Sequence, residues 1–311
     1  FDDAFPISDA HEVVPGLLEG REKIYYNMGK QLTLDKAVLT WVNRLHQGHR
    51  RNAHPPEELV SLTHTLHEQR LLKSPAEIKA MSQSAQLAAI AHRRLMRVCR
   101  PGMNEARLQA ELMHEFQCHG SEASYLPIIG GGDNGCVLHY IDNNKALRDG
   151  DLVLVDAGCE VEKYASDITR TFPVSGHFTK QQQALYEIVL AAQLAAIEQA
   201  QPGQPWDAIH DAAVRVITQG LLDLKLLSGS LDECIEAGEY RQFFMHKTGH
   251  WLGLDVHDVG DYQVDGESRS LEAGMVLTVE PGIYSPSDSQ GVAEEWRGIG
   301  IRIEDDVALT R

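Results

Sequence analysis

The stretch that decides the fold is Asp151–Val174, DLVLVDAGCEVEKYASDITRTFPV. Within it, Leu152–Val155 is an apolar run rich in β-branched residues, which predicts a buried strand that ends on Asp156. A second strand-like run carries Asp167. A hairpin that turns near Val161–Glu162 would place these two acids directly opposite each other, with Cβ atoms about 4.5–5.5 Å apart. Buried carboxylates at that distance repel each other and lose hydration. A divalent cation between them removes both penalties, so the hairpin predicts a metal site.

The bulk composition is that of an ordinary soluble globular protein. The 311 residues are 43% hydrophobic and 23% charged, enough for one large domain or two smaller ones. A formal net charge of −17 argues against nucleic acid and anionic membrane surfaces as partners. No apolar run approaches the roughly 18 residues of a membrane span, and the start, FDDAFPIS, does not resemble a signal peptide. The five cysteines are scattered without a C-x-x-C pair, so we expect a cytoplasmic protein.

A change of pattern at Ser74 marks the start of a helical region. Ser74–Glu77 is a capping box with proline at the first helical position, which predicts a helix that ends at about Val98. Asn104 predicts the cap of a second helix, which ends near Cys118. We expect residues 1–70 and 71–311 to belong to different domains.

The pattern of two helices followed by acid-bearing strands occurs twice. After the first helix pair, strand-like runs at residues 126–129 and 136–140 precede the hairpin. Residues 179–200 and 206–222 predict a second helix pair, and residues 243–307 are again rich in strands. This repetition predicts an internally duplicated α+β domain.

Two later strand-like stretches also bear acids. Met275–Pro281 carries Glu280 near its end, and Gly298–Asp306 places Arg302 and Glu304 on one face. Charged residues are depleted from apolar strands. Each acid alone is better explained as an edge residue or a salt-bridge partner, such as Glu304 with Arg302. Their repetition of the hairpin's pattern favours a common role in binding metal. The two strands could pair around the turn-rich segment between them.

Histidines gather in Phe243–Gly260, FFMHKTGHWLGLDVHDVG. His246 and His250 are four residues apart, but Lys247 replaces the glutamate of an H-E-x-x-H zinc helix and the glycines disfavour a helix. We therefore expect one imidazole, from His250 or His257, at the metal site.

Two other features, taken alone, are better explained by a structural role than by a functional one. Gly130–Gly135, GGGDNG, formally matches a dinucleotide-binding fingerprint, but an apolar run follows it instead of a helix, so a tight turn is the better interpretation. His139 lies on that apolar run and by itself is interpreted as a core histidine. The sequence has neither a G-x-S-x-G elbow nor a phosphate-binding P-loop.

The candidate ligands form an oxygen-rich set. They are Asp156, Asp167, Glu280 and Glu304, with one histidine. Four carboxylates balance the charge of two divalent cations, and such ligands favour Mn²⁺ or Mg²⁺, with Co²⁺ or Zn²⁺ where imidazole contributes. Two ions about 3.5–4 Å apart would polarise a carbonyl and hold a hydroxide between them, which predicts a hydrolase.

The stretches DAGCEVEKYASDITRTFPV, HWLGLDVHD, TVEPGIY and GIGIRIEDD resemble the bacterial Xaa-Pro aminopeptidases (aminopeptidase P), a family of pita-bread metallopeptidases. The resemblance covers essentially the whole chain and is strongest from Leu72 onward. It implies an α+β pita-bread catalytic domain over residues 71–311, with two α/β halves related by a pseudo-twofold. Residues 1–70 would be the C-terminal part of a smaller N-terminal domain.

The resemblance also implies roles for individual residues. It implies a dinuclear site, usually of Mn²⁺, whose five ligands are Asp156, Asp167, His250, Glu280 and Glu304. Asp167 and Glu304 would bridge the two ions, and Glu280 would also be the general base for the bridging hydroxide.

Three further residues would face the substrate in such an enzyme. His139 would steady the substrate or the tetrahedral intermediate, which overturns its interpretation as a core residue. His257 would contact the substrate near the proline, and Arg302 would support the pocket.

The implied partner is a peptide with proline at its second position, and a homo-oligomer, a dimer or a tetramer, is expected. The nearest rival is a prolidase, which accepts only Xaa-Pro dipeptides. The sequences of these motifs resemble those of a methionine aminopeptidase less well. The alternatives of a different kind are a pita-bread binding protein or a metal-free enzyme such as creatinase. Here, all five ligand positions carry competent side chains.

Overall fold

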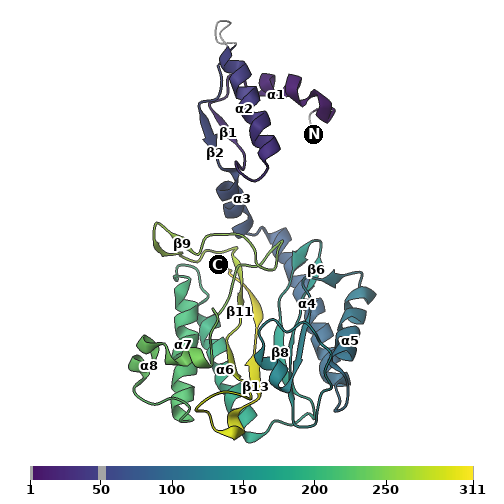
Figure 1. Ribbon diagram of the computed structural model, residues 1–311, viewed down its shortest axis with the longest axis vertical. Coiled ribbons are helices and arrows are strands. Elements are labelled where there is room, and N and C mark those ends of the chain that lie inside the picture. Colours follow the sequence, from purple (N-terminus) through teal and green to yellow (C-terminus); the bar gives the residue numbers. More distant parts are fainter. Residues whose placement is uncertain (1–2, 48–53, 311) are drawn as a thin grey trace. The chain divides into compact units, whose positions relative to one another are not determined.

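The computed structural model describes residues 3–47 and 54–310 (Figure 1). The chain divides into the units Phe1–Gln69 and Arg70–Arg311. In the first unit, two short strands pair in parallel among helices; the elements are α1 (Ala10–Leu18), β1 (Lys23–Tyr25), α2 (Leu32–Gln47), β2 (Glu58–Val60) and most of α3 (Leu62–Leu71). That residues 1–70 are the C-terminal part of a smaller N-terminal domain stays a prediction.

The first helix pair of the larger unit begins and ends close to the predicted residues. α4 (Pro75–Val98) starts with the predicted capping box, in which Ser74 Oγ accepts from the backbone N–H of Glu77 and the Glu77 carboxylate accepts from that of Ser74. α5 (Glu105–Cys118) starts at Asn104, whose side chain caps the first turn. Short-range capping signals therefore fix both helices.

The strand that opens the hairpin is the centre of a sheet. β5 (Leu152–Asp156) lies between β4 (Ile128–Gly131) and β8 (Thr169–Pro173) and is antiparallel to both. All of β5 is buried, as its apolar run predicts. α4 and α5 lie beside this sheet (Figure 1) and share a core cluster with it.

The turn of the hairpin lies one residue later than predicted. β6 (Cys159–Val161) pairs with β7 (Tyr164–Ala165) and, on its other side, with β3 (Glu122–Ala123). The turn residues are Glu162 and Lys163, with φ of 52° and 72°. Two-residue turns with positive φ usually carry Asn or Gly, so Glu and Lys at these positions give no sequence signal for the turn.

This shift changes which residues face each other. Asp156 is paired with Thr169, and the predicted direct opposition of Asp156 and Asp167 is wrong. The register is carried through the irregular link between the two ladders, where Ala157 N donates to Ile168 O over 3.0 Å.

The predicted strand at residues 136–140 is also wrong. Gly132–Cys136 forms a 3₁₀ turn, and His139 is exposed on the irregular segment after it. The GGGDNG stretch thus provides the end of β4 and a tight turn, as predicted, and no dinucleotide-binding helix follows it.

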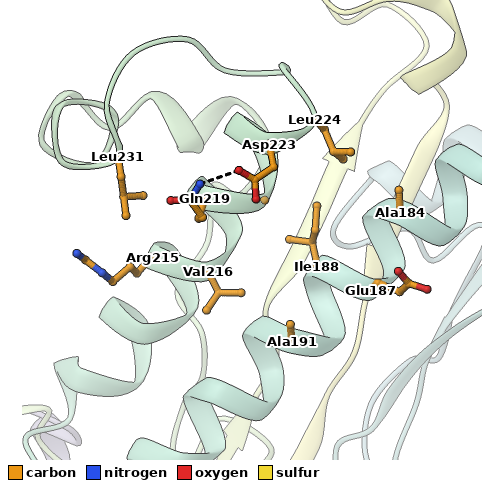
Figure 2. A pocket seen from close by; sticks show the side chains of 11 residues that line it. Ala184, Glu187, Ile188, Ala191, Arg215, Val216, Gln219, Asp223, Leu224 and Leu231 are labelled. Atoms are coloured by element: carbon orange, nitrogen blue, oxygen red, sulfur yellow. Dashed lines mark hydrogen bonds between the residues drawn. The ribbon is translucent and has the colours of Figure 1, made fainter.

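The second half repeats the helix pair and the antiparallel strands. Its helices are α6 (Lys180–Gln199), α7 (Asp207–Asp223) and the short α8 (Leu231–Ala237). A surface hollow of about 650 Å³ lies between α6 and α7 (Figure 2), with mostly apolar walls that include Ile188 and Val216. A further hairpin joins β9 (Gln263–Val264) to β10 (Glu267–Ser268).

The two acid-bearing strands of this half pair with each other, as predicted, but each is interrupted. β11 (Val276–Val279) pairs with β14 (Asp305–Ala308), and β12 (Gly282–Ser285) pairs with β13 (Ile299–Arg302). The breaks fall at residues 280–281 and 303–304.

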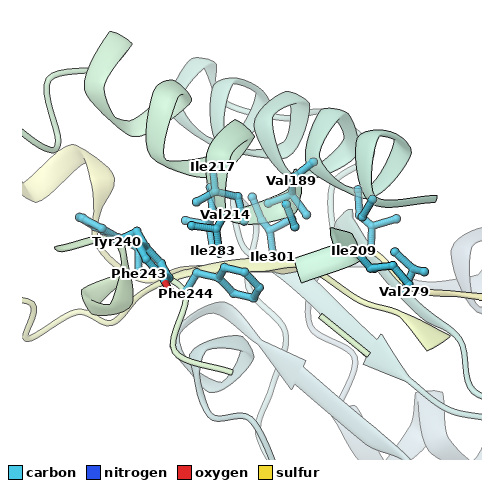
Figure 3. Packing of buried hydrophobic residues seen from close by; sticks show 14 of the residues in the cluster. Val189, Ile209, Val214, Ile217, Tyr240, Phe243, Phe244, Val279, Ile283 and Ile301 are labelled. Carbon is cyan, nitrogen blue, oxygen red and sulfur yellow. The ribbon is translucent and has the colours of Figure 1, made fainter. Parts of the chain in front are cut away.

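The largest core cluster lies between these strands and the second helix pair. Figure 3 shows Val214 and Ile217 of α7 facing Ile283 and Ile301 of the strands. Both helix pairs flank the strands between them (Figure 1), which is the α+β arrangement predicted from the repeated pattern. Among the described residues, no helix combines the length and apolar character needed to cross a membrane.

Candidate metal centre

One cavity contains every residue predicted for the site. Its volume is about 880 Å³, and its walls include His139, Asp156, Asp167, His250, His257, Glu280, Arg302 and Glu304. These residues come from both halves of the unit, because the strands of the two halves meet at an isolated bridge between Thr169 and Glu304. The site therefore depends on the two halves being held together.

Asp156 and Asp167 approach each other although they are not paired. The hydroxyl of Tyr125 lies 2.5 Å from Oδ1 of each carboxylate. Burial, with the charges of the two acids, raises the pKa of Tyr125 well above its usual value, so this hydroxyl stays a donor. Tyr125 is a site residue that sequence reasoning missed, because its short loop has no periodic pattern.

Glu280 and Glu304 meet where the ladders of the second half are interrupted. The register pairs Val279 with Asp305 and Gly282 with Arg302, which brings Glu280 directly opposite Glu304. Their backbone amides donate outside the ladder, that of Glu280 to Thr248 O at 2.8 Å and that of Glu304 to Thr169 O at 3.1 Å. Directly opposed acids were expected at Asp156 and Asp167. They are found instead at Glu280 and Glu304, in the second half of the unit.

Three of the candidate ligands form a tight cluster. Ligand atoms of Asp167, His250 and Glu304 all lie within 4.8 Å of one another. His250 Nε2 lies 3.4 Å from Asp167 Oδ2 and 3.7 Å from Glu280 Oε1. Its Nδ1 lies 3.0 Å from Trp251 O, which leaves Nε2 facing the acids. An imidazole oriented in this way is suited to ligate a metal.

The charges in this cavity fit bound cations. Burial raises the pKa of Glu280 to about 7, despite the opposing charges of His250 and Arg302. Burial, followed by the neighbouring acids, also raises the pKa of Asp167 and that of Glu304. For His250, burial is outweighed by Asp167 and Glu280, and its pKa rises to about 9. Divalent cations would offset the repulsion and burial that raise the pKa values of these acids, and would keep the carboxylates ionised.

Arg302 pairs with Asp156, not with Glu304 as in the alternative interpretation of these strands. Its Nη2 lies 2.5 Å from Asp156 Oδ2, and its Nη1 donates to Tyr284 Oη at 2.9 Å. Glu304 instead accepts a 2.6 Å hydrogen bond from Thr169. Arg302 is buried, so it supplies a fixed positive charge beside the carboxylates.

The histidines line the cavity beside the acids. The rings of His250 and His257 have centroids 4.3 Å apart, and burial, followed by the charge of His250, lowers the pKa of His257. His246 Nε2 lies 2.8 Å from Tyr284 Oη, and burial lowers the pKa of His246 to about 4. His246 therefore contacts the hydroxyl that Arg302 also holds.

A second residue missed from the sequence supports the backbone at the site. Both carboxylate oxygens of Asp306 accept from the backbone N–H of Asp167 at 3.2 Å. The run of acids in GIGIRIEDD could have suggested this role, since Asp306 lies two residues from Glu304 on the same strand face.

Comparisons with known proteins agree with this site. Residues 79–311 match the model of metallopeptidase family M24. The Xaa-Pro aminopeptidase of Escherichia coli (strain K12) is 46% identical over 310 residues, which are 99% of this chain and 70% of that protein. The structure of Pseudomonas aeruginosa aminopeptidase PepP has a TM-score of 0.94 at 52% identity and covers 100% of this chain and 70% of its own. A zinc-substituted E. coli aminopeptidase P in complex with product has a TM-score of 0.92 at 46% identity, with 99% and 70% covered.

Proposed function

Because this chain belongs to metallopeptidase family M24, we propose that it is a metal-dependent Xaa-Pro aminopeptidase. The reaction is hydrolysis of the bond between an N-terminal residue and a following proline. Identity of 46% over nearly the whole chain to an Xaa-Pro aminopeptidase supports this reaction. The predicted resemblance and the predicted pita-bread fold are confirmed by the same comparisons.

The observation that carries the proposal is the single cavity that gathers all eight predicted residues. We propose that two divalent cations would be held there by Asp156, Asp167, His250, Glu280 and Glu304. Mn²⁺ is the preferred candidate because four of the five ligands are carboxylates, and Co²⁺ or Zn²⁺ remain alternatives. When bound, the ions polarise the scissile carbonyl and lower the pKa of a water.

The remaining steps belong to side chains of this chain. Glu280, whose carboxylate lies beside His250 in the cavity, accepts the proton of the attacking water and passes it to the proline nitrogen as the amide bond breaks. His139 donates to the substrate carbonyl oxygen as it gains negative charge, and His257 contacts the substrate near the proline. Arg302 holds Asp156 in place and carries a positive charge that buried acids require.

Two finer features of the protein are also proposals. All five cysteines are free thiols, which suits a reducing compartment, so we propose a cytoplasmic location. We propose a homo-oligomer, a dimer or a tetramer, and light scattering of the purified chain tests this.

A panel of peptides tests the reaction. Xaa-Pro-Yaa, Xaa-Ala-Yaa and the Xaa-Pro dipeptide would each be incubated with Mn²⁺-loaded protein, and release of the first residue measured. We expect cleavage of Xaa-Pro-Yaa and little cleavage of Xaa-Ala-Yaa. Cleavage of the dipeptide alone would make the protein a prolidase. Two bound ions without cleavage of any peptide would favour a pita-bread binding protein.

A further inference from the structure

A fully buried carboxylate lies outside the candidate metal centre, at the first residue of α5. Glu105 is 0% exposed, and four groups donate to it. Its Oε1 accepts from Gly131 N at 2.8 Å and from Asn134 Nδ2 at 2.9 Å, and its Oε2 accepts from Tyr140 Oη and Lys145 N, both at 2.8 Å. All four donors are neutral groups. A buried carboxylate that is satisfied by neutral donors contributes more to a fixed geometry than to stability.

The donors belong to one loop, which carries His139. Gly131 and Asn134 precede His139, and Tyr140 and Lys145 follow it. The Tyr140 side chain is buried in a cluster with Ile128, and its hydroxyl reaches Glu105. Burial, and then the bond to Glu105, raises the pKa of Tyr140 to about 12, so the hydroxyl stays a donor.

The glycines of the GGGDNG turn permit this wrapping of the chain. A Cβ on Gly130 would lie 2.7 Å from Asn134 O, and a Cβ on Gly131 would overlap the side chain of Leu147. Because a Cβ on Gly130 would overlap backbone atoms, only glycine fits at that position, and the turn has a structural reason for its glycines. It lets the loop fold tightly around the carboxylate of Glu105.

Two further hydrogen bonds fix the same loop at its far end. Glu105 N donates to Lys145 O at 2.9 Å, and Asn104 Nδ2 donates to Asn144 O at 2.9 Å. The loop is therefore tied to the start of α5 on both sides of His139, while His139 itself stays exposed in the cavity.

We propose that Glu105 is a positioning residue for His139, acting through Tyr140 and the loop backbone. This rests on the proposed function, in which His139 donates to the substrate carbonyl. A donor displaced by about 1 Å can cost about 100-fold in rate, so a rigid loop is needed to hold it. Metal binding does not involve this loop, so the effect should fall on turnover and leave the ions bound.

Glu105→Gln tests the proposal with nearly unchanged shape. Whichever way the amide is turned, its NH₂ group faces two of the groups that donated hydrogen bonds to the carboxylate. We expect kcat/KM on Xaa-Pro-Yaa to fall about 10- to 100-fold, with the Mn²⁺ content unchanged. Tyr140→Phe, which removes a single donor and keeps the ring, should give a smaller fall. Glu111→Gln is the matched control, because Glu111 lies on the same helix and pairs with Arg94 at 2.6 Å.

A double-mutant cycle separates positioning from general damage. In a His139→Ala background, Glu105→Gln should change kcat/KM by less than about twofold, because the group that it positions is gone. An equal fall in both backgrounds, or a fall that accompanies loss of Mn²⁺, would overturn the proposal.

Hydrogen exchange of residues 137–147 gives a readout that needs no activity. We expect faster exchange in Glu105→Gln than in the wild type and in Glu111→Gln. Unchanged exchange would show that Glu105 does not hold this loop. If the wild type cleaves no Xaa-Pro peptide, the proposed function fails, and the exchange data still decide whether Glu105 holds the loop.

Discussion

Glu280 lies directly opposite Glu304 at the break between two antiparallel ladders, and each residue donates its backbone N–H to a different segment of the chain. Opposed like charges weaken a pair of strands. Here the break releases both side chains from regular pairing and turns them into the cavity with His250 and Asp167. The second half of the domain thus contains a local cost that a bound cation would offset.

Glu304→Gln should separate stability from metal binding. Glutamine keeps the shape of the acid and removes a charge that burial and neighbouring acids disfavour. We expect the chelator-treated variant to unfold at the same temperature as chelator-treated wild type, or at a higher one. Wild type should gain about 2.7 kcal/mol for each bound ion at a Mn²⁺ concentration 100 times the dissociation constant of that site, and the variant should gain far less. Thermal unfolding with and without Mn²⁺ measures both effects.

Glu295→Gln makes the same chemical change at an exposed residue, and it should behave like wild type in both conditions. A Glu304→Gln protein that is less stable than wild type without metal, yet gains as much from Mn²⁺, would show that Glu304 is a structural residue and no ligand.

His92 should make the protein less stable in mild acid. It is 2% exposed on α4, its Nδ1 lies 2.9 Å from Ala88 O, and burial lowers its pKa below 6.5. Below pH 6.5 the unfolded chain therefore binds a proton that the folded chain resists, so this residue lowers the free energy of unfolding as the pH falls.

Urea unfolding of wild type and His92→Leu at pH 7.5, 6.5 and 5.5 checks this expectation. The difference between the two proteins isolates His92 from the site acids, whose raised pKa values act in the opposite direction. His92→Leu should gain stability relative to wild type as the pH falls. A difference that is constant with pH would contradict the account of His92.

Gly158→Ala should be strongly destabilising. A Cβ at Gly158 would overlap the backbone carbonyl oxygen of Ser166, in the segment that joins Asp156 to the hairpin. Since backbone must move to relieve the overlap, we expect a loss of about 3 kcal/mol or more. Gly16→Ala is the control, because the residue is helical and a Cβ there would meet no atom within 4 Å beyond its chain neighbours and the backbone of its own helix. That control should be neutral or slightly stabilising in urea unfolding, and a mild effect at Gly158 would show that the hairpin can relax.

Sequence reasoning succeeded where the determinants are local. The capping box at Ser74 predicted the start of α4, and the apolar run before Asp156 predicted the central strand. It failed where backbone conformation decides the register, because positive φ at Glu162 and Lys163 is not visible in those residue types.

Only part of the candidate site could be predicted from local sequence patterns. Acids on apolar strands stand out by composition, so four carboxylates could be named from the residues alone. His139 could not, because its exposure depends on a loop wrapped around Glu105, and its role came from family resemblance. Tyr125 acts through a tertiary contact with Asp167 that no local pattern indicates, and for Asp306 the run of acids in GIGIRIEDD was the available signal.

The most direct test of the metal-dependent mechanism is a Mn²⁺ titration of chelator-stripped protein, followed by hydrolysis of an Xaa-Pro-Yaa tripeptide. We predict no cleavage without metal, activity that rises with added Mn²⁺ and reaches a plateau at two ions per chain, and no recovery in Asp167→Asn. Cleavage that persists in the stripped protein, or a folded wild-type chain that binds no Mn²⁺, would contradict the dinuclear site.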